Sequence, residues 1–187
     1  TLHSQVMLSE PQSHHVARVL RMHPGERITL FRGDNREFSA VILAVKKHHV
    51  TVRIEDVQTI NRESPRTIHL AQGIAKKDHM QFIIQKAVEL GVTSITPLLT
   101  QHGAVKKHTK QLEKKHSHWE AIAISACEQS GRNTIPDILA PISFDAYIES
   151  CTAKNKFLLD PLAQTRWQAV PHSTHDDIAL LIGPEGG

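Results

Sequence analysis

The clearest potential for chemistry lies in a glycine-rich segment that directly follows an apolar run. Ile178–Ile182 is apolar and leads into Gly183-Pro184-Glu185-Gly186-Gly187. In open α/β sheets ligands bind outside the carboxyl ends of the strands, and glycines let the backbone approach a ligand closely. The alternative is a tight turn that leads to another element. Phosphate binding is not the natural interpretation, because the segment lacks both the P-loop Gly-Lys-Ser/Thr and the three spaced glycines of dinucleotide sites.

A second cluster, Glu128-Gln129-Ser130-Gly131-Arg132, ends a long amphipathic segment. Gly131 fits the left-handed residue that closes a helix, which is a structural role. The cluster brings a carboxylate, an amide and a guanidinium to one helix end beside a sheet. Such a combination is unusual if its only role is structural. Glu128 and Arg132 are therefore candidate functional residues, with both interpretations open.

Basic residues form a third set. Arg18 and Arg21 are three apart in a short predicted helix, and Arg32 lies in a later turn. Arginines of this kind can hold phosphates through charge-assisted hydrogen bonds. The lysine-rich stretches are interpreted as solvated faces; they are Lys76-Lys77, Lys106-Lys107, Lys110 and Lys114-Lys115.

The fourteen histidines do not indicate a metal site. His14-His15 and His48-His49 are adjacent pairs, which seldom point at one site, and His116-x-His118 lacks the i, i+4 spacing of two ligands on a helix. The HExxH pattern and the Gly-x-Ser-x-Gly nucleophile elbow are also absent. We expect surface histidines, no bound metal and no serine nucleophile.

Two kinds of element pattern divide the chain. The first part predicts a helix over Ser13–Met22 and short strands at Arg27–Phe31, Phe38–Val45 and Val50–Val57, which favours a small barrel or sandwich. Asn61–Pro65 is the best linker candidate. In the second part strands alternate with helices, which predicts a mostly parallel sheet. Its predicted strands are Thr67–Ile74, Ser94–Leu99, Lys156–Asp160 and Ile178–Ile182, and its helices are Asp78–Leu90, capped by Asp78, and Lys110–Ser130.

Composition sets the class of protein. The chain has 187 residues, 40% hydrophobic and 22% charged, as in an ordinary globular protein. A net charge of +3 suits a polyanionic partner but equally fits a slightly basic enzyme with no nucleic-acid role. Two cysteines, Cys127 and Cys151, are too few for a disulfide framework. No apolar run approaches the ~20 residues of a membrane span, and no signal peptide is evident, so we expect a cytoplasmic protein.

Four stretches, in order along nearly the whole chain, resemble the 16S ribosomal RNA uracil methyltransferases that modify ring nitrogen 3, members of the SPOUT superfamily. They are similar to that family's PUA-like RNA-binding domain, its first catalytic helix and strand, its long helix with the following loop, and its cofactor loop. The stretches are His14–Val16 with Val19–Arg21 and Gly25; Gln85–Val92 with Ile95 and Pro97; Trp119–Arg132 with Pro136; and Leu180–Gly187.

The resemblance implies S-adenosylmethionine (SAM) as methyl donor, a trefoil-knotted α/β domain, a homodimer, and a uridine in small-subunit ribosomal RNA as target. Residues 1–64 would form a PUA-like β-barrel that binds RNA, and residues 65–187 a SPOUT methyltransferase domain that is incomplete at its carboxyl end. The cofactor would be bound by Leu181, Ile182, Gly183, Pro184, Glu185, Gly186 and Gly187.

For this implied reaction we assign the charged residues hypothetical roles. Arg132 would stabilise the uracil anion or orient the base, and Glu128 would act as a base or positioning group. Arg18, Arg21 and Arg32 would hold RNA phosphates.

Two departures from the family pattern leave alternatives open. Thr100-Gln101-His102-Gly103 stands where the family has Ser/Thr-Glu-Arg-Ser/Thr, and the chain ends at Gly187 where the family continues. One alternative is a SPOUT methyltransferase that acts on transfer RNA or on another ribosomal base. The other is a non-catalytic RNA-binding factor of ribosome assembly.

Overall fold

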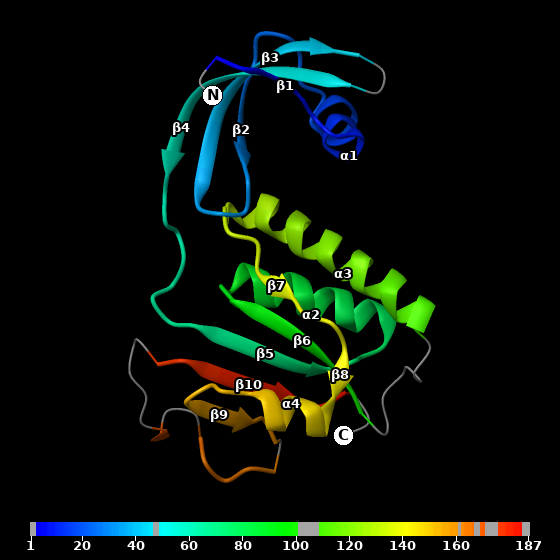
Figure 1. Cartoon of the computed structure of the whole chain (residues 1–187), viewed down its shortest axis with the longest axis vertical. Coiled ribbons are helices and arrows are strands. Elements are labelled where there is room, and N and C mark those ends of the chain that lie inside the picture. Colours follow the sequence, from blue (N-terminus) through cyan, green and yellow to red (C-terminus); the bar gives the residue numbers. More distant parts are fainter. Residues whose placement is uncertain are drawn as a thin grey trace. The chain divides into compact units, whose positions relative to one another are not determined.

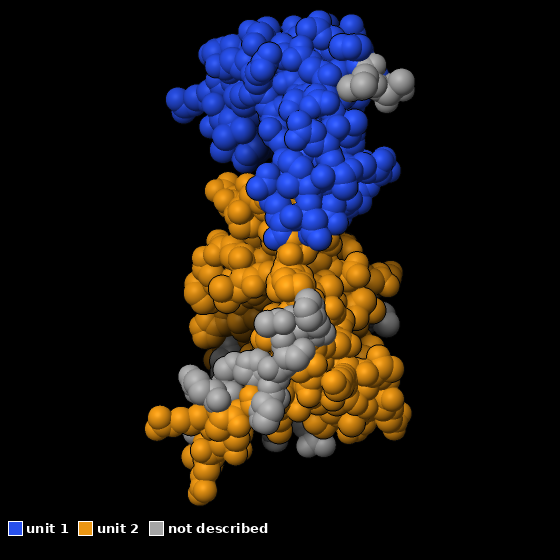
Figure 2. All heavy atoms as spheres, turned by 90° about the vertical axis from the view of Figure 1, so that its left-hand side faces the viewer, with its two compact units in different colours: residues 1–62 blue, residues 63–187 orange. Residues whose placement is uncertain are grey.

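The computed structural model describes residues 3–46, 49–100, 109–160, 162–166, 169–170 and 176–184. The chain divides into two compact units, which we call unit 1 (Thr1–Arg62) and unit 2 (Glu63–Gly187) (Figure 2). The division falls within the stretch expected to be a linker. No helix among the described residues is long and apolar enough to cross a membrane.

Unit 1 is built on a four-stranded antiparallel sheet in the order β1-β4-β3-β2. Alternation places Val50, Val52 and Ile54 on one face of β4, where they are buried with Ile42 of β3 and Val16. The three predicted strands are confirmed, two of them longer than expected, and β1 was not predicted. The strands are β1 (Gln5–Met7), β2 (Arg27–Phe31), β3 (Arg36–Val45) and β4 (Val50–Thr59).

The helical segment of unit 1 begins earlier than the sequence indicated. Helix α1 (Glu10–His14) continues as a π-helix over His15–Val19. It begins at Ser9, whose backbone N–H donates to Oε1 of Gln12, and Pro11 fits the first turn. Buried Ser13 ties α1 to the sheet, because its Oγ donates to the carbonyl of Leu8 and accepts the N–H of Val50.

Unit 2 contains a parallel sheet in the order β7-β6-β5-β10-β9, with β8 also pairing with β6 (Figure 1). The predicted parallel sheet is confirmed, although the short strands β7 and β8 were not predicted. Strand β10, late in the sequence, lies between β5 and β9. The strands are β5 (Ile68–Gly73), β6 (Ser94–Leu99), β7 (Asp137–Ile138), β8 (Ile142–Ser143), β9 (Asn155–Leu158) and β10 (Ile178–Ile182).

Helices α2 (Lys77–Glu89) and α3 (Thr109–Ser130) pack together on one face of the sheet, and α4 (Phe144–Ser150) lies on the other (Figure 1). Tyr147 of α4 is buried in a core cluster with residues of β5, β6 and β10. The prediction that Asp78 caps α2 is wrong, because the N-cap is Lys76. Asp78 lies in the first turn, where its charge still favours the helix dipole.

The parallel strands give the sheet of unit 2 two chemically different edges. We call the end where β5, β6 and β10 finish the carboxyl edge, and the end where they begin the amino edge. Because each crossover returns to the start of the next strand, α2 and α3 both begin at the carboxyl edge and end at the amino edge.

Candidate functional site

At the carboxyl edge a buried amide holds the start of the glycine-rich segment. Ile182, the last residue of β10, lies beside Gln72 of β5. The Gln72 side chain is only 2% exposed, and its Nε2 donates to the carbonyls of Gly73, at 3.0 Å, and Gly183, at 3.2 Å. The path of the chain directly after β10 therefore depends on Gln72.

Gly73 permits a second close contact at the same place. A Cβ atom at this position would lie 2.6 Å from both Cδ and N of Pro184, and 3.0 Å from the carbonyl carbon of Gly183. Carbon atoms do not approach to such distances, so any larger residue would displace the Gly183-Pro184 backbone. Gly73 thus allows β5 and the segment after β10 to meet.

The structure describes four of the seven residues expected to bind the cofactor. Leu181 is buried in the core of unit 2, and its carbonyl accepts the N–H of Leu159 at 2.9 Å. Exposure begins at Gly183, whose backbone is the first of the segment to face solvent. The remaining three, residues 185–187, lie outside the described residues, as do Gln101, His102 and Gly103 of the departing stretch.

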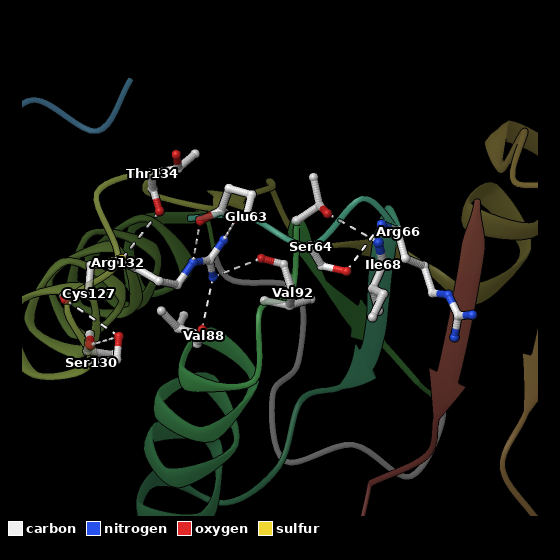
Figure 3. Close-up of polar contacts among 12 residues, drawn as sticks. Glu63, Ser64, Arg66, Ile68, Val88, Val92, Cys127, Ser130, Arg132 and Thr134 are labelled. Atoms are coloured by element: carbon white, nitrogen blue, oxygen red, sulfur yellow. Dashed lines mark hydrogen bonds and ion pairs between the residues drawn. The ribbon is translucent and has the colours of Figure 1, made fainter. Parts of the chain in front are cut away.

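Arg132 lies at the amino edge and has several partners (Figure 3). Its side chain is 8% exposed. Nε donates to Glu63 at 3.0 Å and Nη2 donates to the other carboxylate oxygen. Nη1 donates to the carbonyls of Val88, at 2.9 Å, and Val92, at 3.1 Å. Arg132 therefore joins the end of α2 to the segment that enters β5.

The two candidate sites are separated by the length of the sheet. Strand β10 has five residues, so its first and last Cα atoms are about 13 Å apart. Glu128 is exposed on α3, and the carboxylate that Arg132 contacts is that of Glu63. Sequence reasoning missed Glu63 because an acid inside a polar linker carries no distinguishing signal.

Cys127, one turn before Gly131, is buried, and its Sγ donates to the carbonyl of Thr134 at 3.5 Å. Burial raises the pKa of the Cys127 thiol, while the nearby Arg132 charge opposes the shift. The thiol therefore stays protonated at neutral pH and is a poor nucleophile.

The arginines of unit 1 fall into two groups. Arg18, Arg21 and Arg32 are exposed, and within the described part of the chain no ion pair or hydrogen bond engages their side chains. The other four arginines of the unit have acidic partners. These pairs are Arg27–Glu55, Arg36–Asp34, Arg53–Glu55 and Arg62–Glu37. The guanidinium groups of these three arginines are therefore available to bind an anionic partner.

Several histidines have structural contacts, His69 and His116 among them. Nδ1 of His69 lies 2.7 Å from Oγ of Ser94, and Nε2 of His116 lies 2.7 Å from the carbonyl oxygen of Ile138. Among the residues that the structure describes, no group of three or more His, Cys, Asp or Glu side chains is arranged to hold a metal ion.

Comparison with protein families decides the class. A family model described as an RNA methyltransferase domain matches residues 62–187, and one described as an RNA methyltransferase PUA domain matches residues 8–55. The chain belongs to the RNA methyltransferase family. The PUA-like domain and the SPOUT-type α/β class expected from the sequence are confirmed.

Similar proteins agree with this assignment. The chain is 37% identical to ribosomal RNA small subunit methyltransferase E of Buchnera aphidicola (subspecies Schizaphis graminum), over 97% of this chain and 74% of that protein. It is 31% identical to the Bacillus subtilis protein of the same name, over 93% of this chain and 71% of that one.

Two solved structures also resemble it. A methyltransferase structure from Legionella pneumophila, in complex with SAM, matches with a TM-score of 0.95 and 45% identity, covering 100% of this chain and 77% of that one. Ribosomal RNA small subunit methyltransferase E of Neisseria gonorrhoeae, bound to SAM, matches with a TM-score of 0.93 and 34% identity, with the same coverage.

The buried Arg132–Glu63 pair predicts a stability effect. We expect Arg132→Ala to lower the free energy of unfolding of unit 2 by about 3 kcal/mol, because it removes the ion pair with the partly buried Glu63 and the side-chain donor to the carbonyls of Val88 and Val92. Urea denaturation followed by circular dichroism measures this change.

The matched control is Arg62→Ala, which breaks an arginine–glutamate pair of similar geometry whose arginine is 48% exposed. Loss of that pair should cost less than about 1 kcal/mol. Equal losses in the two variants would contradict a structural role for Arg132.

Proposed function

We propose that this protein transfers a methyl group from SAM to ring nitrogen 3 of a uridine in 16S ribosomal RNA. The observation that carries the proposal is the carboxyl edge, where Gln72 and Gly73 hold the Gly183-Pro184 backbone at the end of a central parallel strand. Membership of the RNA methyltransferase family and the SAM-bound relatives support the donor.

The residues at the carboxyl edge fit a cofactor that is held through the backbone. Bound SAM supplies an electrophilic methyl group on its sulfonium. Leu181 anchors the segment in the core, and the backbone of Gly183 is exposed at the carboxyl edge. In the proposed site, Leu181 through Gly187 hold the adenosine and methionine parts.

The protein must also favour loss of the proton from ring nitrogen 3, because neutral uracil carries one there. Extruding the base from its stack costs a few kcal/mol, which contacts in the site recover. Arg132 stays our candidate for stabilising the resulting anion, and Glu128 our candidate base or positioning group. Because Arg132 lies at the amino edge and Gly183 at the carboxyl edge of one sheet, a catalytic role for Arg132 requires the carboxyl edge of a second chain. The role is therefore tied to the proposed homodimer.

Unit 1 is proposed to hold the RNA. Arg18, Arg21 and Arg32 form no ion pair or hydrogen bond through their side chains among the described residues, although the hydrogen bond from Arg36 and, to a smaller extent, the charge of Arg32 lower the pKa of Asp34. Their guanidinium groups can therefore pair with phosphates without first breaking a direct ion pair. The protein would act in the cytoplasm, on ribosomal RNA or an assembled small subunit.

The activity itself is tested with the complete protein, isotope-labelled SAM and small ribosomal subunits that lack the modification. We expect label in 3-methyluridine after nucleoside analysis by mass spectrometry. Label in a different nucleoside would support a methyltransferase and contradict the proposed uridine target. Absence of label despite RNA binding would favour an assembly factor.

The three unpaired arginines predict the salt dependence of RNA binding. The triple variant Arg18→Ala/Arg21→Ala/Arg32→Ala should bind 16S RNA at least tenfold more weakly and release about three fewer counterions, so the slope of log affinity against log salt becomes shallower. Filter binding over a salt series measures both. Arg53→Ala, which removes a paired arginine, should change neither; equal effects would exclude the proposed phosphate contacts.

The contacts at the carboxyl edge predict cofactor affinity. Gln72→Leu removes two hydrogen bonds to carbonyls, each of which contributes about 1 kcal/mol, so we expect SAM to bind about tenfold more weakly or worse. Gly73→Ala should weaken binding as well, because its Cβ displaces Pro184. Isothermal titration calorimetry measures the affinity, with the exposed Gln129→Leu as control. Unchanged affinity in both variants would show that this segment does not bind SAM.

A further inference from the structure

A cavity of about 410 Å³ lies between the first halves of α2 and α3 in unit 2. We infer that it is a nucleotide subsite, which takes one unstacked nucleotide of the RNA with the base inside and the phosphate at the rim. This inference rests on the proposed function and adds to it a second RNA contact, outside unit 1. The volume lies within the range typical of small-ligand sites.

The cavity adjoins the carboxyl edge. Ile74, which lines it, directly follows Gly73, and Gly73 is the residue that lies against Pro184. Helices α2 and α3 both begin at this edge, so the cavity and the proposed cofactor segment lie on the same side of unit 2. A nucleotide bound in the cavity would therefore be close to the place of methyl transfer.

The charged side chains that line the cavity are basic as far as the described residues extend. Lys114 and Lys115 belong to the lining, together with His118, and no described aspartate or glutamate does. Glu113, their neighbour on α3, and Asp78, in the first turn of α2, are exposed residues outside the lining. The rim therefore favours an anionic group such as a phosphate over a neutral or cationic ligand.

The floor of the cavity is apolar, which an anion alone would not require. It includes Ile74 and Met80, each 1% exposed, and the indole of Trp119, which is 4% exposed. A base has apolar faces and a polar edge, so it can fill such a floor while its phosphate remains outside.

Amide groups complete the lining. The side chains of Gln81 and Gln111 offer donors and acceptors for a base edge. Nε2 of Gln81 lies 3.0 Å from Nε2 of His118, so α2 and α3 are bridged at the rim. The cavity therefore offers an apolar floor for the faces of a base, amides for the edge of the base, and cations for the phosphate.

The helical spacing explains how the rim is assembled. Lys114 and Lys115 lie three and four residues after Gln111, and His118 lies four and three residues after them, so the four side chains share one face of α3. The sequence analysis interpreted these lysines as a solvated face. Only the packing of α3 against α2 places them around an apolar floor.

Fluorine NMR of 5-fluorotryptophan-labelled complete protein tests the subsite, because Trp119 lines it and Trp119→Phe identifies its signal. Titration with uridine 5′-monophosphate, without SAM, should shift the Trp119 signal saturably. The double variant Lys114→Ala/Lys115→Ala should weaken this binding at least tenfold. Lys110→Ala, which removes a lysine of α3 outside the lining, should leave it unchanged.

Three results would overturn the subsite: no shift of the Trp119 signal, a shift that the double lysine variant does not weaken, or the same shift from inorganic phosphate alone. The last result would indicate an anion site without a base. Because the readout needs neither SAM nor methyl transfer, its failure is distinct from a failure of the methylation assay. In that assay the double variant should raise KM for ribosomal RNA with little change in kcat.

Discussion

The contact between Gly73 and Pro184 can form only where two parallel strands end side by side. Strand β10 enters the sheet next to β5, although more than a hundred residues separate them along the chain. Their common end brings a residue with no side chain against a proline and brings the amide of Gln72 within reach of the Gly183 carbonyl. The candidate cofactor segment, the first turns of α2 and α3, and the cavity between these helices all lie at this edge of the sheet.

The opposite edge of the sheet has a different task. There Arg132 pairs with the carboxylate of Glu63 and donates to the backbone carbonyls of Val88 and Val92. A buried ion pair of this kind costs desolvation and is retained only when its geometry satisfies most of the groups involved. The two edges differ because the strands are parallel. The carboxyl edge is available for ligands, and at the amino edge Arg132 joins the end of α2 to the segment that enters β5.

Charge is distributed so that some cations remain available. In unit 1 four arginines are paired with nearby acids, while Arg18, Arg21 and Arg32 are not paired within the described residues. In unit 2 Lys114 and Lys115 border an apolar cavity with no acidic side chain among its described lining residues. A protein that binds a polyanion needs such unpaired cations, because each phosphate contact releases counterions and contributes affinity only if the cation is not already neutralised.

The sequence by itself determined the order and type of most elements, since hydrophobic periodicity and turn residues are local properties. Strand β10 and the strand at Ser94–Leu99 were predicted with the bounds that the structure shows, and the parallel sheet followed from alternation. The short strands and α4 were missed because two to seven residues carry too little periodicity. Local patterns also placed Arg132 and the glycine-rich segment among the candidates, and motif resemblance indicated the family.

Only the tertiary structure decided which candidates lie together. It separated Arg132 from Gly183 by the length of a strand, paired Arg132 with Glu63, and brought Gln72 and Gly73 to the segment after β10. It also placed the lysines of α3 beside Trp119. These are contacts between residues distant in sequence, and they arise from how strands order and helices pack in space, which no local pattern of residue types encodes.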